Sequence, residues 1–193
     1  PTRHPLLYRI WFNWMLPPAL RKHRADAFLS PDGYLSLRTS LPQLAVIHDL
    51  NFEHYPHDLP PAYSRYYRSF FPRFAEKAAR IATVSAFSKR DIMATYGIAE
   101  GKIDVVPNGI GEVFRPLAEA EKGAARARLT GGRPYFVSIG SLHPRKNIAR
   151  LLEAFDRFAE HQPDARLVVV GEAFWWDPRM KAAWGAMRHT DKE

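Results

Sequence analysis

The sequence contains no cysteine, so disulfides and thiolate metal sites are excluded. No apolar run approaches the roughly 20 residues that a membrane-spanning helix needs. There is neither a GxxxxGKS/T loop nor a GxGxxG turn, which argues against a P-loop ATPase and an ordinary NAD enzyme. No serine stands in a GxSxG context, so hydrolysis through a nucleophile elbow is not supported either.

Acidic residues are scarce in the first half of the chain. Residues 1–90 carry 13 Lys and Arg against 6 Asp and Glu, whereas residues 91–193 carry 15 against 14. Most of the net charge of +8 therefore belongs to the first half. A basic surface attracts nucleic acid, anionic membranes or phosphorylated ligands, although a merely solvated basic surface is an equally valid interpretation.

Short apolar strands alternate with helical segments along the chain, and this pattern is typical of parallel sheets in an α/β protein. The segments that read as strands are "DAFLS", "QLAVIHDL", "RIATVS", "KIDVVPNG", "PYFVSIG" and "ARLVVVGE". Helices are expected at 61–79, at 86–97 behind the cap residue Ser85, at 118–129 and at 147–161. We expect Pro72 to kink or divide the first of these. The last stretch, 173–193, shows no strong period.

Residues 109–117 follow neither period and contain Gly109, Gly111 and Pro116. We interpret this segment as a linker between two Rossmann-like domains. The expected domains are residues 1–112 and 113–193.

Residues 5–22 resemble an amphipathic helix that Pro17 and Pro18 interrupt. Its large apolar side chains could pack in a core or touch a membrane. We favour the core, because the run is short and lacks a clean basic face. The side chains concerned are Trp11, Phe12, Trp14 and Leu16.

Ligands of open α/β sheets bind beyond the carboxyl ends of the strands, and three polar clusters fall there. One is Ser85 with Ser88 and Lys89, and another is His48 with Asp49. The third runs from Gly140 to Asn147 and places Arg145 and Lys146 where a helix begins.

The third cluster indicates an anion site. A helix N-terminus disfavours cations, so two of them are best explained by an anion in front of them. Gly140 allows close backbone approach, Ser141 offers a hydroxyl, and Arg145 and Lys146 suit a diphosphate. The alternative is a pair of solvated surface cations.

The pair His48-Asp49 is ambiguous from chemistry alone, since a histidine at a strand end is often a hydrogen-bonded structural residue. A metal site of His48, His54 and His57 is not favoured, because spacings of six and three residues across a proline-containing loop match no strong metal pattern.

Five segments follow one another in a recognisable order: "VIHDLNFEHYP", "RIATVSAFSKRDI", "KIDVVPNGI", "SIGSLHPRKNIARLLEAF" and "RLVVVGE". Together, over residues 25–172, they resemble the retaining glycosyltransferases of family 4. The resemblance implies the GT-B fold, an α/β architecture of two Rossmann-like domains with parallel sheets, both incomplete in this chain. Residues 1–112 would be the later part of the acceptor-side domain and 113–193 the first part of the domain that binds the donor nucleotide.

The resemblance also implies roles for individual residues. Arg145 and Lys146 match the basic pair that holds the donor diphosphate, and Gly140, with Ser141 beside it, matches the glycine turn against the phosphates. His48 matches the histidine beside the donor sugar, and Asp49 would orient it.

The implied activity is that of a hexosyltransferase that moves a sugar from a nucleotide-sugar donor to a glycan or lipid-linked acceptor of the cell envelope, with retention of configuration. No metal or other cofactor is expected. The implied location is the cytoplasm, peripherally at the inner face of the membrane, with the basic first domain on anionic lipid.

Two features of the family pattern have no counterpart in this sequence: the glycine-rich loop after the first strand, and a late Glu-x7-Glu element. We therefore expect the chain to be the middle of a transferase, with little or no activity by itself. The alternatives are a non-catalytic scaffold and a basic nucleic-acid-binding module. The second would use the aromatic and basic residues of "YSRYYRSFFPRF", but their spacing is that of a buried helix stripe.

Overall fold

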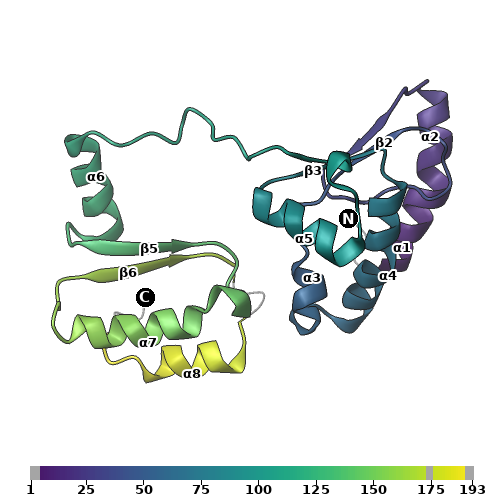
Figure 1. Cartoon of the computed structure of the whole chain (residues 1–193). Helices are drawn as coiled ribbons and strands as arrows, with labels where there is room; N and C mark the ends of the chain where they lie inside the picture. The colour runs from purple at the N-terminus through teal and green to yellow at the C-terminus, as the bar shows by residue number, and fades with distance from the viewer. Residues whose placement is uncertain (1–4, 173–175, 190–193) are drawn as a thin grey trace. The chain divides into compact units, whose positions relative to one another are not determined.

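The computed structural model describes residues 5–172 and 176–189 and contains two compact units (Figure 1). Unit 1 is Pro1–Ile110 and unit 2 is Gly111–Glu193. The division between them falls inside the segment 109–117 that the sequence suggests as a linker.

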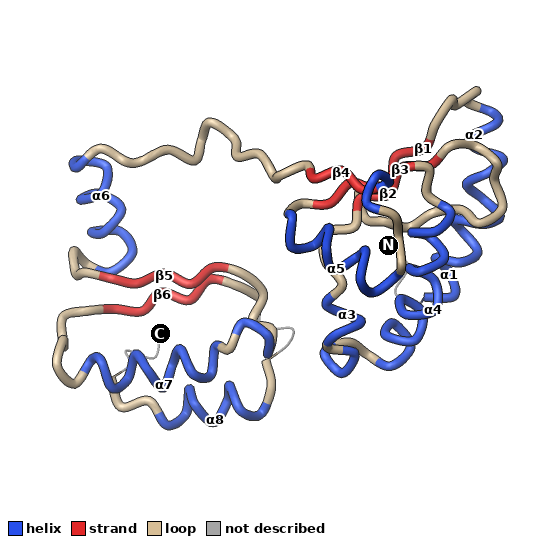
Figure 2. The backbone as a smooth tube through the Cα atoms, viewed as in Figure 1, coloured by secondary structure: helices blue, strands red, loops and turns tan. Residues whose placement is uncertain are grey.

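Unit 1 contains a parallel sheet of four strands in the order β1-β2-β3-β4 (Figure 2). The strands are β1 (Phe28–Ser30), β2 (Gln43–Val46), β3 (Arg80–Thr83) and β4 (Ile103–Val105). Each strand pairs with the next one along the chain, and Ala45 of β2 lies opposite Ile81 of β3. All carboxyl ends therefore meet at one edge of the sheet, where a ligand site is expected.

Helices precede and connect these strands, and they share the core of unit 1 with strand and loop residues. They are α1 (Pro5–Ile10), the π-helix η1 (Trp11–Met15), α2 (Leu16–Lys22), α3 (Asn51–His54), η2 (Pro56–Asp58), α4 (Pro61–Lys77), α5 (Ala86–Tyr96) and η3 (Glu100–Lys102). The aromatic stripe of α4 turns inward, since Tyr66, Phe71 and Phe74 are buried. The expected burial of this stripe is confirmed, so these rings are not available to stack on nucleic-acid bases.

Helix α4 is not divided at Pro72. The proline lacks the N–H that would bond to Arg68. Its neighbours Phe71 and Phe74 are both buried in the core of unit 1, and this packing holds the helix together across the missing bond.

Residues 5–22 form one helical segment, and the expected break at Pro17 and Pro18 is wrong. The two prolines stand in the first turn of α2, which follows η1 without a gap. The irregularity lies just before them, in the π-helical turn η1.

The expected core packing of this segment is also partly wrong. Leu16 is buried, but the side chains of Trp11 and Trp14 are 45% and 59% exposed. The side of this segment that faces the protein carries Tyr8 and Phe12. Their rings stack on Tyr34, with 5.2 and 5.3 Å between ring centres.

Unit 2 contains two parallel strands with helices packed on them. Its elements are α6 (Glu119–Thr130), β5 (Tyr135–Ile139), η4 (Pro144–Lys146), α7 (Ile148–Ala159), β6 (Arg166–Val170) and α8 (Pro178–Ala186). Leu152 and Phe155 of α7 and Met180 of α8 form its buried core. The sequence suggests a fully buried strand at β6, but the strand is only half-buried because nothing described in unit 2 covers one face of the sheet.

Helix α8 lies in the stretch 173–193, whose sequence shows no strong period. Its N-terminus is capped by Asp177, whose Oδ1 accepts from the N–H of Met180 at 2.7 Å. The Asp-Pro pair at 177–178 is the signal that the periodicity search missed. Residues 173–175 and 190–193 of the same stretch lie outside the described residues.

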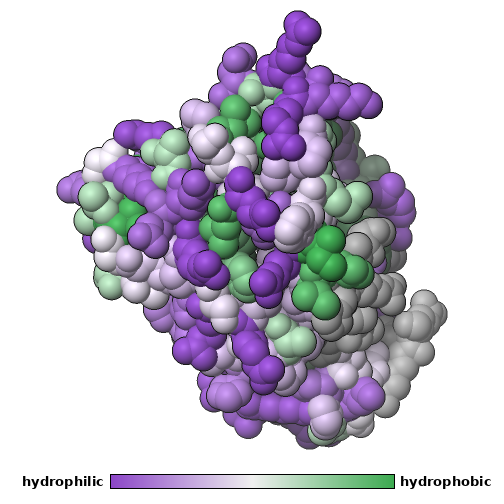
Figure 3. Space-filling view, turned by 90° about the vertical axis from the view of Figure 1, so that its right-hand side faces the viewer, coloured by the Kyte–Doolittle hydropathy of each residue, from purple (hydrophilic) through white to green (hydrophobic). Residues whose placement is uncertain are grey.

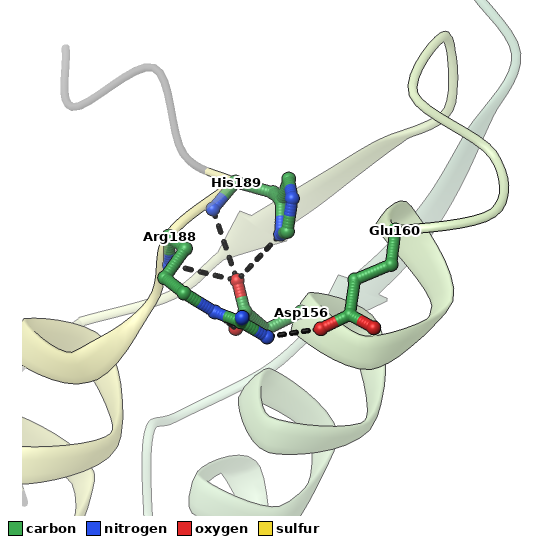
Figure 4. Close-up of polar contacts among 4 residues, drawn as sticks. All are labelled: Asp156, Glu160, Arg188 and His189. Carbon is green, nitrogen blue, oxygen red and sulfur yellow. Dashed lines mark hydrogen bonds and ion pairs between the residues drawn. The ribbon is translucent and has the colours of Figure 1, made fainter.

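Asp156 of α7 holds the residues that follow α8 against α7 (Figure 4). Its Oδ1 accepts from the backbone N–H groups of Arg188 and His189 at 2.8 and 3.0 Å, and the Arg188 guanidinium also reaches Glu160. The hydrogen bond from the His189 backbone, with those from Arg188, lowers the pKa of Asp156 to about 2.

Both units thus have α/β architecture with parallel strands, as the alternating pattern predicts. Among the residues that the structure describes, no helix has the length and apolar character to cross a bilayer.

Candidate functional site

A pocket of about 440 Å³ opens in unit 1 at the carboxyl ends of β1 and β2. It brings together the predicted residues His48 and Asp49 with a third polar residue, Asp32. The remaining lining is mostly aromatic and consists of Tyr8, Phe12, Tyr34, Val46, Ile47, Phe52, Tyr67 and Phe71.

His48 is held by the loop that follows β1. Its Nε2 lies 3.0 Å from the carbonyl oxygen of Pro31 and donates to it, which leaves Nδ1 as an acceptor in the neutral ring. The loop comes this close because Gly33 has a φ of +76°, and a Cβ there would lie 3.1 Å from the carbonyl oxygen of Val46.

Asp49 starts the next turn of the chain. Its Oδ1 accepts from the N–H of Asn51 at 3.0 Å, an arrangement that fixes the carboxylate at the pocket mouth. Both His48 and Asp49 are exposed, whereas Ile47 and Leu50 on either side are buried and anchor them.

Three tyrosines, Tyr8, Tyr34 and Tyr67, line the same pocket. The sequence reasoning did not identify them as site residues. The hydroxyls of Tyr34 and Tyr67 are hydrogen-bonded at 2.8 Å. Burial, followed by the bond to Tyr67, raises the pKa of Tyr34, so its hydroxyl stays protonated at neutral pH. For Tyr34 the available signal was its position just after a strand, and for Tyr67 its position on the inner stripe of α4, whereas nothing in the sequence pointed to Tyr8.

A larger groove of about 890 Å³ lies elsewhere in unit 1, among α3, η2, α4 and α5. Its main polar groups already pair with one another, since Glu53 accepts from Arg68 at 3.1 Å and from the Tyr96 hydroxyl at 2.9 Å. It contains neither His48 nor Asp49, so we place the site at the strand ends instead.

The three histidines considered as a metal site do not come together. Nε2 of His54 pairs with Asp91 at 2.9 Å, whereas His48 bonds to Pro31 and His57 lines the larger groove. Over residues 5–172 and 176–189, no group of three His, Asp or Glu side chains is arranged to hold a metal ion.

The polar cluster of Ser85, Ser88 and Lys89 is explained by helix capping and an ion pair. Ser85 accepts from the N–H of Ser88 at 3.1 Å and begins α5, and Lys89 pairs with Glu100 at 3.5 Å. These contacts explain why a serine and a lysine stand at these positions, and no bound ligand is needed to explain them.

In unit 2, the loop 140–147 connects the carboxyl end of β5 to α7. Gly140 has a φ of +138°, a region that favours glycine. Its N–H continues the sheet by donating to the carbonyl of Val170 at 2.9 Å, and Ser141 beside it is exposed.

Arg145 and Lys146 lie in the 3-10 turn η4, which comes directly before α7. Asn147 separates them from the helix because it adopts the left-handed conformation at a φ of +55°. Both side chains are exposed, and neither forms an ion pair with a carboxylate anywhere in the described ranges. Two adjacent cations are therefore available to an anion.

Two residues that support this loop were missed by the sequence reasoning. His143 is buried, and its Nδ1 accepts from the N–H of Arg145 at 3.2 Å, which sets the shape of the turn. A Cβ on Gly171 would lie 1.9 Å from the carbonyl oxygen of Gly140, so only glycine fits there. The strand-end position of Gly171 in "VVVGE" was the available signal.

Comparison with known proteins matches both units to family models. Residues 1–112 match the model described as Glycosyltransferase Family 4, and residues 121–183 match Glycosyl transferases group 1.

A curated protein, the O-antigen chain mannosyltransferase B of Escherichia coli, is 26% identical over 180 residues. That alignment covers 91% of this chain and 47% of the relative. A crystal structure of a glycosyltransferase from Rickettsia africae ESF-5 matches with a TM-score of 0.58 at 16% identity, over 100% of this chain and 51% of that one. The chain thus spans about half the length of these relatives, and the structural likeness confirms the predicted pair of Rossmann-like domains.

Proposed function

The chain belongs to Glycosyltransferase Family 4, and on that premise we propose that the complete protein transfers a sugar from a nucleotide-sugar donor to a glycan or lipid-linked acceptor. We further propose that the transfer retains the anomeric configuration and that the transferred group is a hexose. The activity proposed is that of a protein as long as the relatives, of which this chain spans about half.

The observation that carries this proposal is the exposed cation pair of the loop 140–147. Arg145 and Lys146 have no carboxylate partner in the described ranges and stand at the carboxyl end of β5, the edge at which parallel sheets bind ligands. A guanidinium can hold two phosphate oxygens, and an ammonium adds a point charge.

This pair would also supply the chemistry that departure of a nucleoside diphosphate requires. Negative charge grows on the leaving group as the glycosidic bond breaks, and fixed cations stabilise that charge. We therefore propose that the reaction needs no metal ion or other cofactor. Gly140 would allow the phosphates to approach the backbone, and the exposed Ser141 would donate to them from its hydroxyl.

His48 and Asp49 would act beside the donor sugar. The bond to Pro31 fixes the His48 ring, so its orientation does not have to be established during the reaction. Asp49 is held by the Asn51 N–H and serves to orient neighbouring polar groups.

The pocket around them suits a sugar ring of the acceptor. Its lining contains two carboxylates, an imidazole and several aromatic rings but no Lys or Arg, so it disfavours phosphate and suits a neutral polyol. We assign the acceptor side of the reaction to this pocket.

The biological setting is proposed from the comparisons. The curated relative is named as an O-antigen chain mannosyltransferase, which makes a mannosyl donor and a cell-envelope glycan the first candidates. With such an acceptor, the protein would work in the cytoplasm, peripherally on the anionic inner face of the membrane.

A product assay tests the proposal. Full-length protein is incubated in EDTA with a panel of nucleotide sugars and a glycan acceptor, and the anomeric configuration of the product is read by NMR. We expect transfer with retention in the presence of EDTA. Inversion, or complete dependence on added metal, would contradict the proposed reaction.

A further inference from the structure

The groove among α3, η2, α4 and α5 is not used by the proposed reaction, although its volume of about 890 Å³ is that of a ligand site. Pockets that hold small molecules usually measure about 300–1,000 Å³. We call it the α4 groove. Part of its wall is apolar and stiff, because proline fixes the backbone φ. The apolar residues that line it are Pro56, Leu59, Pro61 and Pro72.

The one carboxylate among the described residues that line the α4 groove already has partners. It belongs to Glu53, whose side chain is 13% exposed. Its Oε2 accepts from Nε of Arg68 at 3.1 Å, and its Oε1 accepts from the Tyr96 hydroxyl at 2.9 Å. Each oxygen of this carboxylate therefore accepts a hydrogen bond from within the groove.

Several hydrogen-bond donors of the α4 groove are free. Arg68 uses only Nε, so its two terminal nitrogens have no partner among the described residues. Arg65 stands three residues earlier on α4, and its guanidinium pairs with no carboxylate in residues 5–172 and 176–189. The exposed ring of His57 forms no ion pair in these ranges either. Because the free groups are mainly donors, the ligand that fits them is rich in acceptors.

The charges of the α4 groove favour an anion. Arg65 and Arg68 are neighbours on the surface of α4 and repel each other, and Glu53 neutralises only one of them. Hydrophilic residues cover much of the side of unit 1 that faces the viewer in Figure 3, so an exposed cation by itself marks no site. The α4 groove differs because its cations line a cavity together with an apolar wall.

We propose that the α4 groove binds a small phosphate ester. The guanidinium of Arg65 and the terminal nitrogens of Arg68 would hold the phosphate oxygens, and the organic part of the ligand would lie against the prolines. The bond to Glu53 fixes the Arg68 side chain beforehand, which lowers the entropy cost of binding. The groove belongs to unit 1 and shares no residue with the loop 140–147, so the inference does not rest on the proposed function.

Isothermal titration of the full-length protein tests the proposal. The loop 140–147 is itself proposed to bind phosphate, so every protein titrated carries Arg145→Ala with Lys146→Ala. The probe is phenyl phosphate, and benzyl alcohol is the neutral compound compared with it. The test variant is Arg65→Gln, which removes a guanidinium that has no carboxylate partner to lose. The matched control is Arg73→Gln, which removes an exposed arginine of α4 that does not line the groove.

We expect phenyl phosphate to bind saturably at one site and benzyl alcohol not to bind. Loss of one charge-assisted contact in Arg65→Gln should weaken the binding of phenyl phosphate about tenfold, and Arg73→Gln should leave it unchanged.

Two results with phenyl phosphate would overturn the inference. One is the absence of saturable binding, and the other is an equal affinity of the Arg65→Gln and Arg73→Gln proteins. Vesicles with phosphatidylglycerol and a hexaglutamate peptide are titrated in parallel. If either binds in an Arg65-dependent way and phenyl phosphate does not, the groove takes a lipid surface or an acidic protein segment, which contradicts a small phosphate ester.

Discussion

At the residue scale, the loop 140–147, where we propose that the donor binds, depends on two glycines that act together. Gly140 takes a φ of +138°, and its carbonyl occupies the space that a Cβ on Gly171 would need. The loop that carries Arg145 and Lys146 therefore starts from a contact between two backbones. The charges of Arg145 and Lys146 are easily recognised in the sequence, but their position depends on two glycines, which have no side chain.

Substitution of Gly171 tests this contact. Gly171→Ala forces the Gly140 carbonyl to move, and we expect a loss of about 1–3 kcal/mol in the free energy of unfolding. Urea denaturation of the full-length protein measures it. The control is Gly185→Ala, where an added Cβ meets nothing within 4 Å and the helix α8 should gain about 0.5–1 kcal/mol. Equal effects of the two substitutions would contradict the contact.

The sequence was sufficient to nominate chemical groups but not the residues that position them. The placement of His48 and Asp49 at one strand end and of the cations at another follows from strand periodicity and residue type. The roles of Gly33, His143 and Gly171 depend on which backbone atoms approach them, and no local pattern encodes that. The left-handed conformation of Asn147, which separates Lys146 from the helix, could not be predicted, because sequence alone does not distinguish it from a helical one.

At the element scale, helices were predicted well where one face is strongly apolar. They were predicted poorly where contacts with distant parts of the chain determine which face is buried. The stripes of α4 and α7 gave a clear period. The segment 5–22 has large apolar side chains on more than one side, so the period alone does not say which side faces the core. The contacts of Tyr8 and Phe12 with Tyr34, which lies elsewhere in the chain, determine that side. Helix α8 was missed because alanines and a glycine dilute its apolar face.

The hydrogen bonds of Asp156 to the residues after α8 predict that the stability of the folded state depends on pH. The pKa of Asp156 is about 2 in the folded chain, below the ordinary value of 3.8. Its carboxylate therefore stabilises the folded state above pH 3.8, and this contribution is lost as the pH falls toward 2. We expect Asp156→Asn to lower the thermal midpoint at neutral pH, with a difference from the wild type that shrinks below about pH 4.

Calorimetry across this pH range measures the effect. The control is Asp164→Asn, which removes an exposed carboxylate of unit 2 in the turn before β6. A difference for Asp156→Asn that stays constant down to pH 2 would show that the carboxylate charge is not what the bonds to Arg188 and His189 require.

At the scale of the whole molecule, the sequence predicted two parallel α/β units joined by a linker at 109–117, and the structure has two such units with their division inside that segment. Alternating strands and helices carry this information, because each strand must be followed by a crossover to pair in parallel. The half-exposed strand β6 is the exception, since burial of a strand depends on neighbours that the local pattern does not contain.

The central claim is that the loop cations of unit 2 hold the donor diphosphate, and calorimetric titration of the full-length protein with UDP, GDP and ADP tests it most directly. Arg145→Ala with Lys146→Ala is compared with Arg126→Ala with Arg128→Ala, which removes two exposed charges from helix α6 of the same unit. We predict that the first pair weakens binding of the preferred diphosphate by about a hundredfold, as the loss of two charge-assisted contacts implies, and that the second leaves it nearly unchanged. Equal affinity in the wild type and the Arg145/Lys146 variant would contradict the account.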